Sequence, residues 1–310
     1  MNRADFDSGG GGKSEWRERR RRRIRRRGRR AYIRSVYFLP SLATLGNAVC
    51  GFASIYVAAF DTQNVGKDPV AIFLSDHKFV AAAYLVFFAM IFDALDGRLA
   101  RFARHTTDFG GQLDSLADVI SFGAAPAFLA IQVFKVDGPQ LGLFMVSRLV
   151  WAIGALYLSC ALLRLARFNV SNEHGEQHHF SFLGLPSPGA AGTVVSFVLM
   201  QQDLLHSANP DGTGICAILA RVSAWLLPLL VLWTGLLMVS NVRYPHVVNR
   251  YMRGRRSIDR LLLVVALILL LLVAHRYTIG LFMLAYVFSG FASYAYLRLR
   301  PRAAAVPMPS

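Results

Sequence analysis

Long apolar runs recur along most of this chain, and they limit the folds that it can adopt. Several approach or exceed the roughly 20 residues that a helix needs to cross a bilayer. The 310 residues are 55% hydrophobic, with a mean hydropathy of +0.41, which is too apolar for an ordinary soluble domain. Because backbone groups inside lipid must be satisfied within the protein, we expect an all-α fold, a polytopic bundle of membrane helices.

These runs predict about eight transmembrane helices. The last apolar stretch, residues 261–297, would be about 55 Å long as a single helix, so we expect a break at His275 and Arg276. The second span is expected to continue as a basic helical end through Arg104. The expected spans are residues 36–60, 79–92, 114–134, 143–167, 186–201 and 222–241, with two more within 261–297.

Positive charge is concentrated in a few places along the chain. The formal net charge is +16, and residues 17–34 are mostly arginine. Lys and Arg flank the cytoplasmic ends of membrane helices, and the basic clusters fall on one side of the predicted spans, so we expect both termini in the cytoplasm. The clusters on that side are Arg17–Arg34, Arg98–Arg104, Arg164 with Arg167, Arg243–Arg260, and Arg298–Arg302.

The charge pattern also divides the chain into an arm (1–35), a membrane domain (36–298) and a short tail (299–310). We interpret the arm as a disordered cytoplasmic segment that binds anionic lipid, at about 1 kcal/mol per basic residue. Nucleic-acid binding is less favoured, because the arm has neither interleaved aromatic residues nor a folded scaffold. Compact length and the lack of compartment signals favour a prokaryotic inner membrane. The three cysteines lie far apart, which argues against a disulfide framework or a zinc site.

Four carboxylates lie between two of the apolar runs. Asp93 and Asp96 are three residues apart, and Asp114 and Asp118 are four apart, so each pair lies on one face of its own helix. If the two helices pack as an antiparallel pair, all four carboxylates converge. Converging carboxylates repel one another unless a cation neutralises them, and hard divalent ions prefer oxygen ligands. The pattern therefore predicts a site for Mg²⁺ or Mn²⁺.

Small and basic residues accompany the acids on compatible helix faces. Gly97 and Ala100 leave room for a flat or phosphate-bearing ligand, and Arg101 offers a planar fork suited to phosphate. A less favoured interpretation makes the acids capping or loop residues at helix ends. Another is an ion-coupled transporter with the acids as a relay, but this would not explain Gly97, Ala100 and Arg101. A membrane scaffold without catalytic activity is the least favoured.

Together these residues form the pattern D-x2-D-G-x2-A-R-x8-G-x3-D-x3-D, from Asp93 to Asp118. In this pattern the chain resembles the CDP-alcohol phosphatidyltransferase family at every fixed position. The resemblance implies metal-dependent transfer of a phosphatidyl group from CDP-diacylglycerol to an alcohol, with release of CMP. It implies two Mg²⁺ or Mn²⁺ ions on Asp93, Asp96 and Asp114, and a general base at Asp118 that also touches the second ion. It further implies a cytidine diphosphate site that includes Gly97, Ala100 and Arg101.

Three further stretches resemble the phosphatidylserine synthase branch of this family, in which the acceptor is L-serine. They are Phe38–Phe52, Leu163–Val170 and Phe182–Ala191. From these stretches we assign Thr44 and Asn47 to the CDP-diacylglycerol site; for Asn47, a hydrogen bond to another helix is the less favoured alternative. We assign Arg164, Arg167 and Asn169 to serine or phosphate binding; for the two arginines, positive-inside topology is an equally weighted explanation.

Other members of the family leave alternatives open. The acceptor could instead be glycerol 3-phosphate, an inositol phosphate or choline. Ser41 stands where relatives usually carry Asn, which weakens the assignment of the acceptor but not that of the metal site. The resemblance also implies a homodimer formed through membrane helices. The His-rich loop Glu173–His179 is interpreted as a solvated loop rather than a transition-metal site.

Overall fold

All regular structure in the described part of the chain is helical, which confirms the predicted all-α class. The computed structural model describes residues 42–61, 69–103, 108–138, 144–173, 184–208, 214–242, 270 and 274–299. Four predicted segments lie outside these residues. They are the arginine-rich arm, most of the first of the two spans predicted within 261–297, the His-rich loop after Glu173, and the C-terminal tail after Leu299. The predictions for those segments therefore stay predictions.

The described helices follow one another in chain order. A first helix runs over Leu42–Ala58. It is followed by α2 (Pro69–Ala103), α3 (Asp108–Asp118), the π-helix η1 (Val119–Ala124), α4 (Ala125–Asp137), α5 (Phe144–Glu173), α6 (Ser187–His206), α7 (Ile215–Val239) and α10 (His275–Leu299).

Four of the described helices are long and apolar enough to cross a membrane, so the chain is an integral membrane protein. They are Asp76–Leu99, Phe109–Asp137, Met145–Val170 and Ile215–Val239. The total of eight spans and the cytoplasmic orientation of the termini remain predictions. α10 begins at His275, where the sequence predicted a break.

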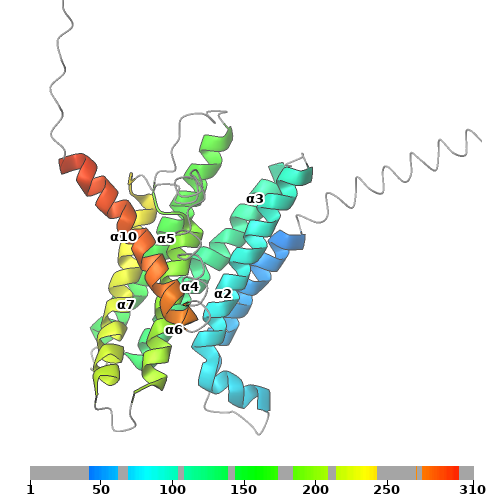
Figure 1. Ribbon diagram of the computed structural model, residues 1–310. Coiled ribbons are helices and arrows are strands. Elements are labelled where there is room, and N and C mark those ends of the chain that lie inside the picture. The colour runs from blue at the N-terminus through cyan, green and yellow to red at the C-terminus, as the bar shows by residue number, and fades with distance from the viewer. Residues whose placement is uncertain are drawn as a thin grey trace, which may run out of the picture.

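α6 is the central helix of the bundle. It packs against α7, α10, α2 and α4, and Figure 1 shows α10 crossing it at a slant. Its buried face includes small residues such as Ala190, Ala191, Gly192 and Ser196. Small residues let membrane helices approach closely. α6 lies among protein neighbours on several sides, which is why it can carry fewer strongly apolar residues than the four spans.

α2 differs from the predicted second span at its N-terminal end. The span was expected to begin at residue 79, whereas the helix begins at Pro69. Non-helical torsion angles at His77 (φ −125°, ψ 17°) bend it there, and Figure 1 shows the first segment turned away from the rest. The bend lies two residues before the predicted start of the span, so the straight part of the helix starts close to the predicted position.

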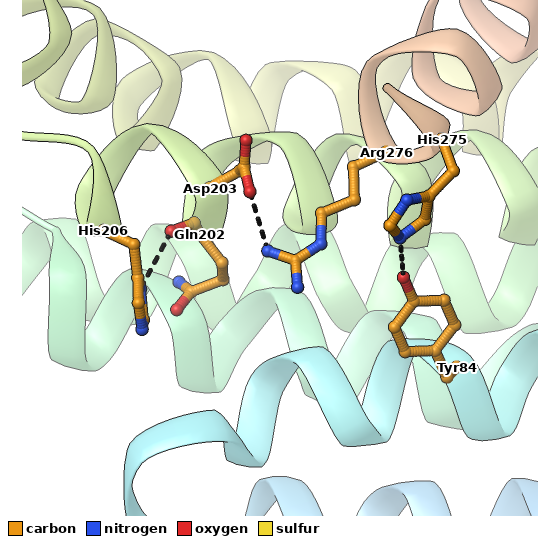
Figure 2. Close-up of polar contacts among 6 residues, drawn as sticks. All are labelled: Tyr84, Gln202, Asp203, His206, His275 and Arg276. Atoms are coloured by element: carbon orange, nitrogen blue, oxygen red, sulfur yellow. Dashed lines mark hydrogen bonds and ion pairs between the residues drawn. The ribbon is translucent and has the colours of Figure 1, made fainter. Parts of the chain in front are cut away.

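Polar contacts fix α10 at one end of the bundle. Arg276 pairs with Asp203 of α6 at 2.8 Å, and the Tyr84 hydroxyl of α2 lies 2.7 Å from Nε2 of His275. Figure 2 shows these two contacts side by side, with His206 bonded to the Gln202 carbonyl in the same layer. Two neighbouring helices therefore hold the start of α10.

The loop before α6 is attached to the end of α7. The amide of Gly184 donates to the Val242 carbonyl at 2.8 Å, and that of Leu185 donates to the Leu237 carbonyl at 3.0 Å. Gly184 has φ +88°, a left-handed conformation that side chains disfavour. α6 therefore starts beside the end of α7 and runs antiparallel to it.

Candidate metal and substrate site

Three of the four predicted carboxylates converge between α2 and α3. One carboxylate oxygen from each of Asp93, Asp114 and Asp118 lies within 4.8 Å of the other two. Asp118 is 9% exposed, and Asp93 and Asp114 are half-buried. The spacing of the acids in the sequence therefore predicted this cluster, which we call the acid cluster.

Asp96 is oriented differently from the other three. It is buried and accepts a hydrogen bond from the Thr44 hydroxyl of the helix Leu42–Ala58. Three residues advance an α-helix by about 300°, so Asp96 stands about 60° around α2 from Asp93. It is electrostatically coupled to Asp93 and Asp114, and its role as a metal ligand remains a prediction.

The helix Leu42–Ala58 forms a third wall of the site. Asn47 is fully buried, and its Nδ2 donates to Oδ1 of Asp118 at 3.0 Å. Thr44 and Asn47 were both predicted to bind CDP-diacylglycerol. In the structure each donates a hydrogen bond to one of the aspartates. Oδ1 of Asn47 is buried and has no hydrogen-bond partner among the described residues.

The acid cluster fits a hard divalent cation. Its donor atoms are all carboxylate oxygens, which Mg²⁺ and Mn²⁺ prefer. Oδ1 of Asp114 is buried without a hydrogen-bond partner in the described part of the chain. A buried acceptor without a partner costs free energy, and a bound cation would remove that cost.

Arg164 of α5 is a cationic side chain close to Asp118. It interacts electrostatically with Asp118 and with Tyr286 of α10, and its Nη1 donates to the Ser187 hydroxyl at 2.9 Å. Its Nε is buried and lacks a partner within the described segments. Arg164 therefore has a donor left for an anionic group beside the acid cluster.

The other two residues predicted to bind serine or phosphate face other helices. Arg167 is exposed and its Nη1 reaches Oδ1 of Asn241, after the end of α7, at a long 3.5 Å. Asn169 exchanges hydrogen bonds with the Ser115 hydroxyl of α3 at 3.0 and 3.1 Å. These contacts join the last turns of α5 to the segment after α7 and to α3.

The space beside Gly97 is free, and the sequence had predicted that this small residue leaves room for a ligand. A Cβ added there would meet no heavy atom within 4 Å outside its own stretch of helix, counting the described residues. Ala100 and Arg101 lie in the last turns of α2, but their side chains are outside the described part. Their part in a nucleotide site stays a prediction.

Two residues near Arg164 were not singled out from the sequence. Ser187 stands between two prolines in a stretch that the sequence analysis had marked, and this position was the available signal. Tyr286 lies more than 100 residues away from Arg164 along the chain. Only the crossing of α10 over α6 brings it near, so no local pattern could have indicated it.

Comparison with known proteins identifies the family. Residues 37–233 match the model of the CDP-alcohol phosphatidyltransferase family. The chain belongs to this family. The matched region contains the acid cluster, its partners on the helix Leu42–Ala58, and Arg164.

Several curated relatives carry serine in their names. The chain is 31% identical over 268 residues to the CDP-diacylglycerol–serine O-phosphatidyltransferase of Helicobacter pylori, covering 86% of this chain and 95% of that protein. It is 34% identical over 167 residues to the protein of the same name from Methanocaldococcus jannaschii, covering 54% and 64% of the two chains. It is 33% identical over 217 residues to the archaetidylserine synthase of Methanothermobacter thermautotrophicus, covering 69% and 72%.

Proposed function

We propose that this protein transfers a phosphatidyl group from CDP-diacylglycerol to L-serine, giving phosphatidylserine and CMP. The convergence of Asp93, Asp114 and Asp118 within 4.8 Å, inside the family's matched region, carries the proposal of phosphatidyl transfer. The names of these relatives all include serine, which supports L-serine as the acceptor.

The residues that would hold Mg²⁺ or Mn²⁺ are Asp93, Asp114 and Asp118, with Asp96 assigned as a fourth ligand for a second ion. When bound, a divalent cation supplies positive charge that stabilises the phosphates of the donor and the departing CMP. Thr44 and Asn47 keep Asp96 and Asp118 in place through their hydrogen bonds. We assign Gly97, Ala100 and Arg101 to the cytidine diphosphate portion of the donor.

Asp118 is the proposed general base. Asn47 holds one of its oxygens, which fixes the carboxylate so that it can accept the proton of the serine hydroxyl. The serine oxygen then bonds to the phosphorus attached to diacylglycerol, and the bond from that phosphorus to CMP breaks. The apolar residues around the site keep out water, which would otherwise hydrolyse the donor to phosphatidic acid.

Arg164 is the proposed contact for the anionic part of a substrate. Its unpartnered Nε suits either the serine carboxylate or a phosphate oxygen. The oxygen atom of Asn47 that lacks a partner suits the serine ammonium. We propose that Arg167 and Asn169 support this site by joining α5 to α7 and α3.

The site is proposed to face the cytoplasm of a prokaryotic inner membrane, because the basic clusters of the sequence flank the same helix ends as the acids. The donor's acyl chains would then remain in the bilayer, with its nucleotide in the cytoplasmic interface. A homodimer remains part of the proposal.

The deciding experiment measures CMP release from CDP-diacylglycerol by the purified full chain. L-serine, glycerol 3-phosphate, inositol phosphate and choline are supplied separately, and the lipid product is identified by mass spectrometry. We expect CMP release with L-serine together with a serine-containing lipid. Release with another alcohol would overturn the acceptor assignment and keep the acid cluster. No release with any acceptor in the presence of Mg²⁺ or Mn²⁺ would favour the transporter interpretation.

A further inference from the structure

The π-helix η1 begins immediately after Asp118. It covers Val119–Ala124, and the amide of Ala125 donates to the Ile120 carbonyl, five residues back, in place of the usual four. π-helices are rare and frequently occur at functional sites. One extra residue within a helix turns the part before it relative to the part after it by about 100°.

This rotation decides where two of the acids point. α4, after η1, is anchored in the core by residues such as Leu129 and Val133, both fully buried. α3, before η1, carries Asp114 and Asp118. Without the inserted residue, α3 would turn by about 100° relative to α4, and both carboxylates would leave the side on which Asp93 stands.

Two hydroxyl groups bond η1 to neighbouring helices, one from η1 itself and one from α5. The Ser121 hydroxyl donates to the Asn47 carbonyl at 2.8 Å, and the Tyr157 hydroxyl of α5 donates to the Phe122 carbonyl at 3.1 Å. Tyr157 is 1% exposed. Both bonds attach η1 to helices outside its own chain segment.

Close packing leaves η1 little freedom to shift. A Cβ added at Gly51 would fall 2.4 Å from the Ser121 Oγ and 2.7 Å from its Cα, so the helix Leu42–Ala58 lies directly against the π-helix. Tyr157 is itself closely packed, because a Cβ added at Gly235 of α7 would fall 3.3 Å from its Cα. Asn47 thus joins η1 through its carbonyl and Asp118 through its side chain.

We propose that Ser121 and Tyr157 are positioning residues, which hold η1 so that Asp114 and Asp118 face Asp93. The proposal rests on the proposed function for the identity of the reaction, but its structural part concerns only the geometry of the acid cluster. Neither hydroxyl touches the acids. Both act through the rotation of α3.

The test compares Tyr157→Phe with Tyr84→Phe. Each variant loses one hydroxyl and keeps the ring, but the Tyr84 hydroxyl bonds to His275 at the other end of the bundle (Figure 2). Mn²⁺ binding to the full chain in detergent is measured by the loss of the electron paramagnetic resonance signal of free Mn²⁺. Outer-shell changes typically weaken metal binding about 10- to 100-fold, and we expect a loss of this size for Tyr157→Phe and wild-type affinity for Tyr84→Phe.

Ser121→Ala is a second, independent variant, because it removes the other hydroxyl without adding bulk beside Gly51. We expect it to weaken Mn²⁺ binding as Tyr157→Phe does, with a thermal unfolding midpoint close to that of Tyr84→Phe. If both variants bind Mn²⁺ as tightly as the wild type, the positioning role is wrong. CMP release by the wild type is measured separately. A wild type that binds Mn²⁺ but releases no CMP overturns the proposed function and leaves the positioning role standing.

Discussion

Single side chains decide how negative charge is tolerated in the acid cluster. An ionised carboxylate in an apolar bundle needs a partner to offset the loss of hydration. Asp96 has Thr44, and Asp118 has Asn47 together with the charge of Arg164. Oδ1 of Asp114 has no such partner among the described residues. The protein therefore offsets only part of the negative charge of the acid cluster, and a bound cation would offset the rest.

Replacing Asp118 by Asn tests the general base. The change keeps the shape of the side chain but removes its ability to accept a proton, and general-base catalysis contributes about 10²–10⁴-fold. We expect CMP release by Asp118→Asn to fall by about this factor, while binding of CDP-diacylglycerol, measured by equilibrium dialysis, largely survives. Substantial remaining turnover would mean that another group takes the proton.

Replacing Arg164 by Lys tests the anion contact. Lysine keeps the charge but loses the fork that bonds Ser187 and presents Nε. Loss of a hydrogen bond to a charged group costs about 1.5–3 kcal/mol, so we expect kcat/KM for L-serine to fall about tenfold to hundredfold. Arg148→Lys, at an exposed position on the same helix, is the matched control and should change kcat/KM much less. Equal effects of the two substitutions would contradict the assignment.

Among the described helices, α6 has its start fixed by contacts with other helices. It starts where the Gly184–Leu185 loop is bonded to the end of α7, and it carries Ser187, the partner of Arg164. Its small residues allow α10 to pack closely, since a Cβ added at Gly192 would fall 3.2 Å from the Met283 Cε. The geometry around Arg164 therefore depends on how α6 begins.

Gly184→Ala should destabilise this start. A Cβ there would fall 2.4 Å from the Met238 carbonyl oxygen, and the left-handed φ alone costs a non-glycine residue about 1–3 kcal/mol. We expect a free energy of unfolding lower by at least about that amount, seen as a lower thermal midpoint. Gly111→Ala is the control, because its Cβ would meet nothing within 4 Å in the described structure and alanine favours helix. A midpoint for Gly184→Ala equal to the wild type would show that the loop can rearrange.

The sequence predicted which segments form helices and which residues share one face of a helix, because both follow from the local spacing of residues. The acids at Asp93, Asp114 and Asp118 converge as their spacing indicated. The π-helix η1 has no signature in the sequence of Val119–Ala124, since its extra residue is held by Ser121 and Tyr157 through contacts with distant helices. The position of Tyr286 near Arg164 likewise depends on the crossing of α10, which local pattern does not determine.

Across the whole molecule, the acid cluster is a junction of helices. Asp93 belongs to α2, Asp114 and Asp118 belong to α3, and Asn47 attaches the helix Leu42–Ala58. Repulsion among the carboxylates pushes these helices apart, and a divalent cation would draw them together. Metal binding should therefore be coupled to the stability of the bundle as well as to activity.

We therefore expect Mg²⁺ or Mn²⁺ to raise the thermal unfolding midpoint of the full chain in detergent, and EDTA to reverse the rise and stop CMP release. A ligand at 100 times its Kd stabilises the native state by about 2.7 kcal/mol. Asp114→Asn should lose most of the metal-induced rise, because it removes the acceptor that lacks a protein partner. Asp203→Asn, which alters a carboxylate in the distant pair with Arg276 (Figure 2), should keep it. A rise of equal size in both variants would mean that the metal binds outside the acid cluster, and an EDTA-insensitive enzyme would contradict metal-dependent transfer.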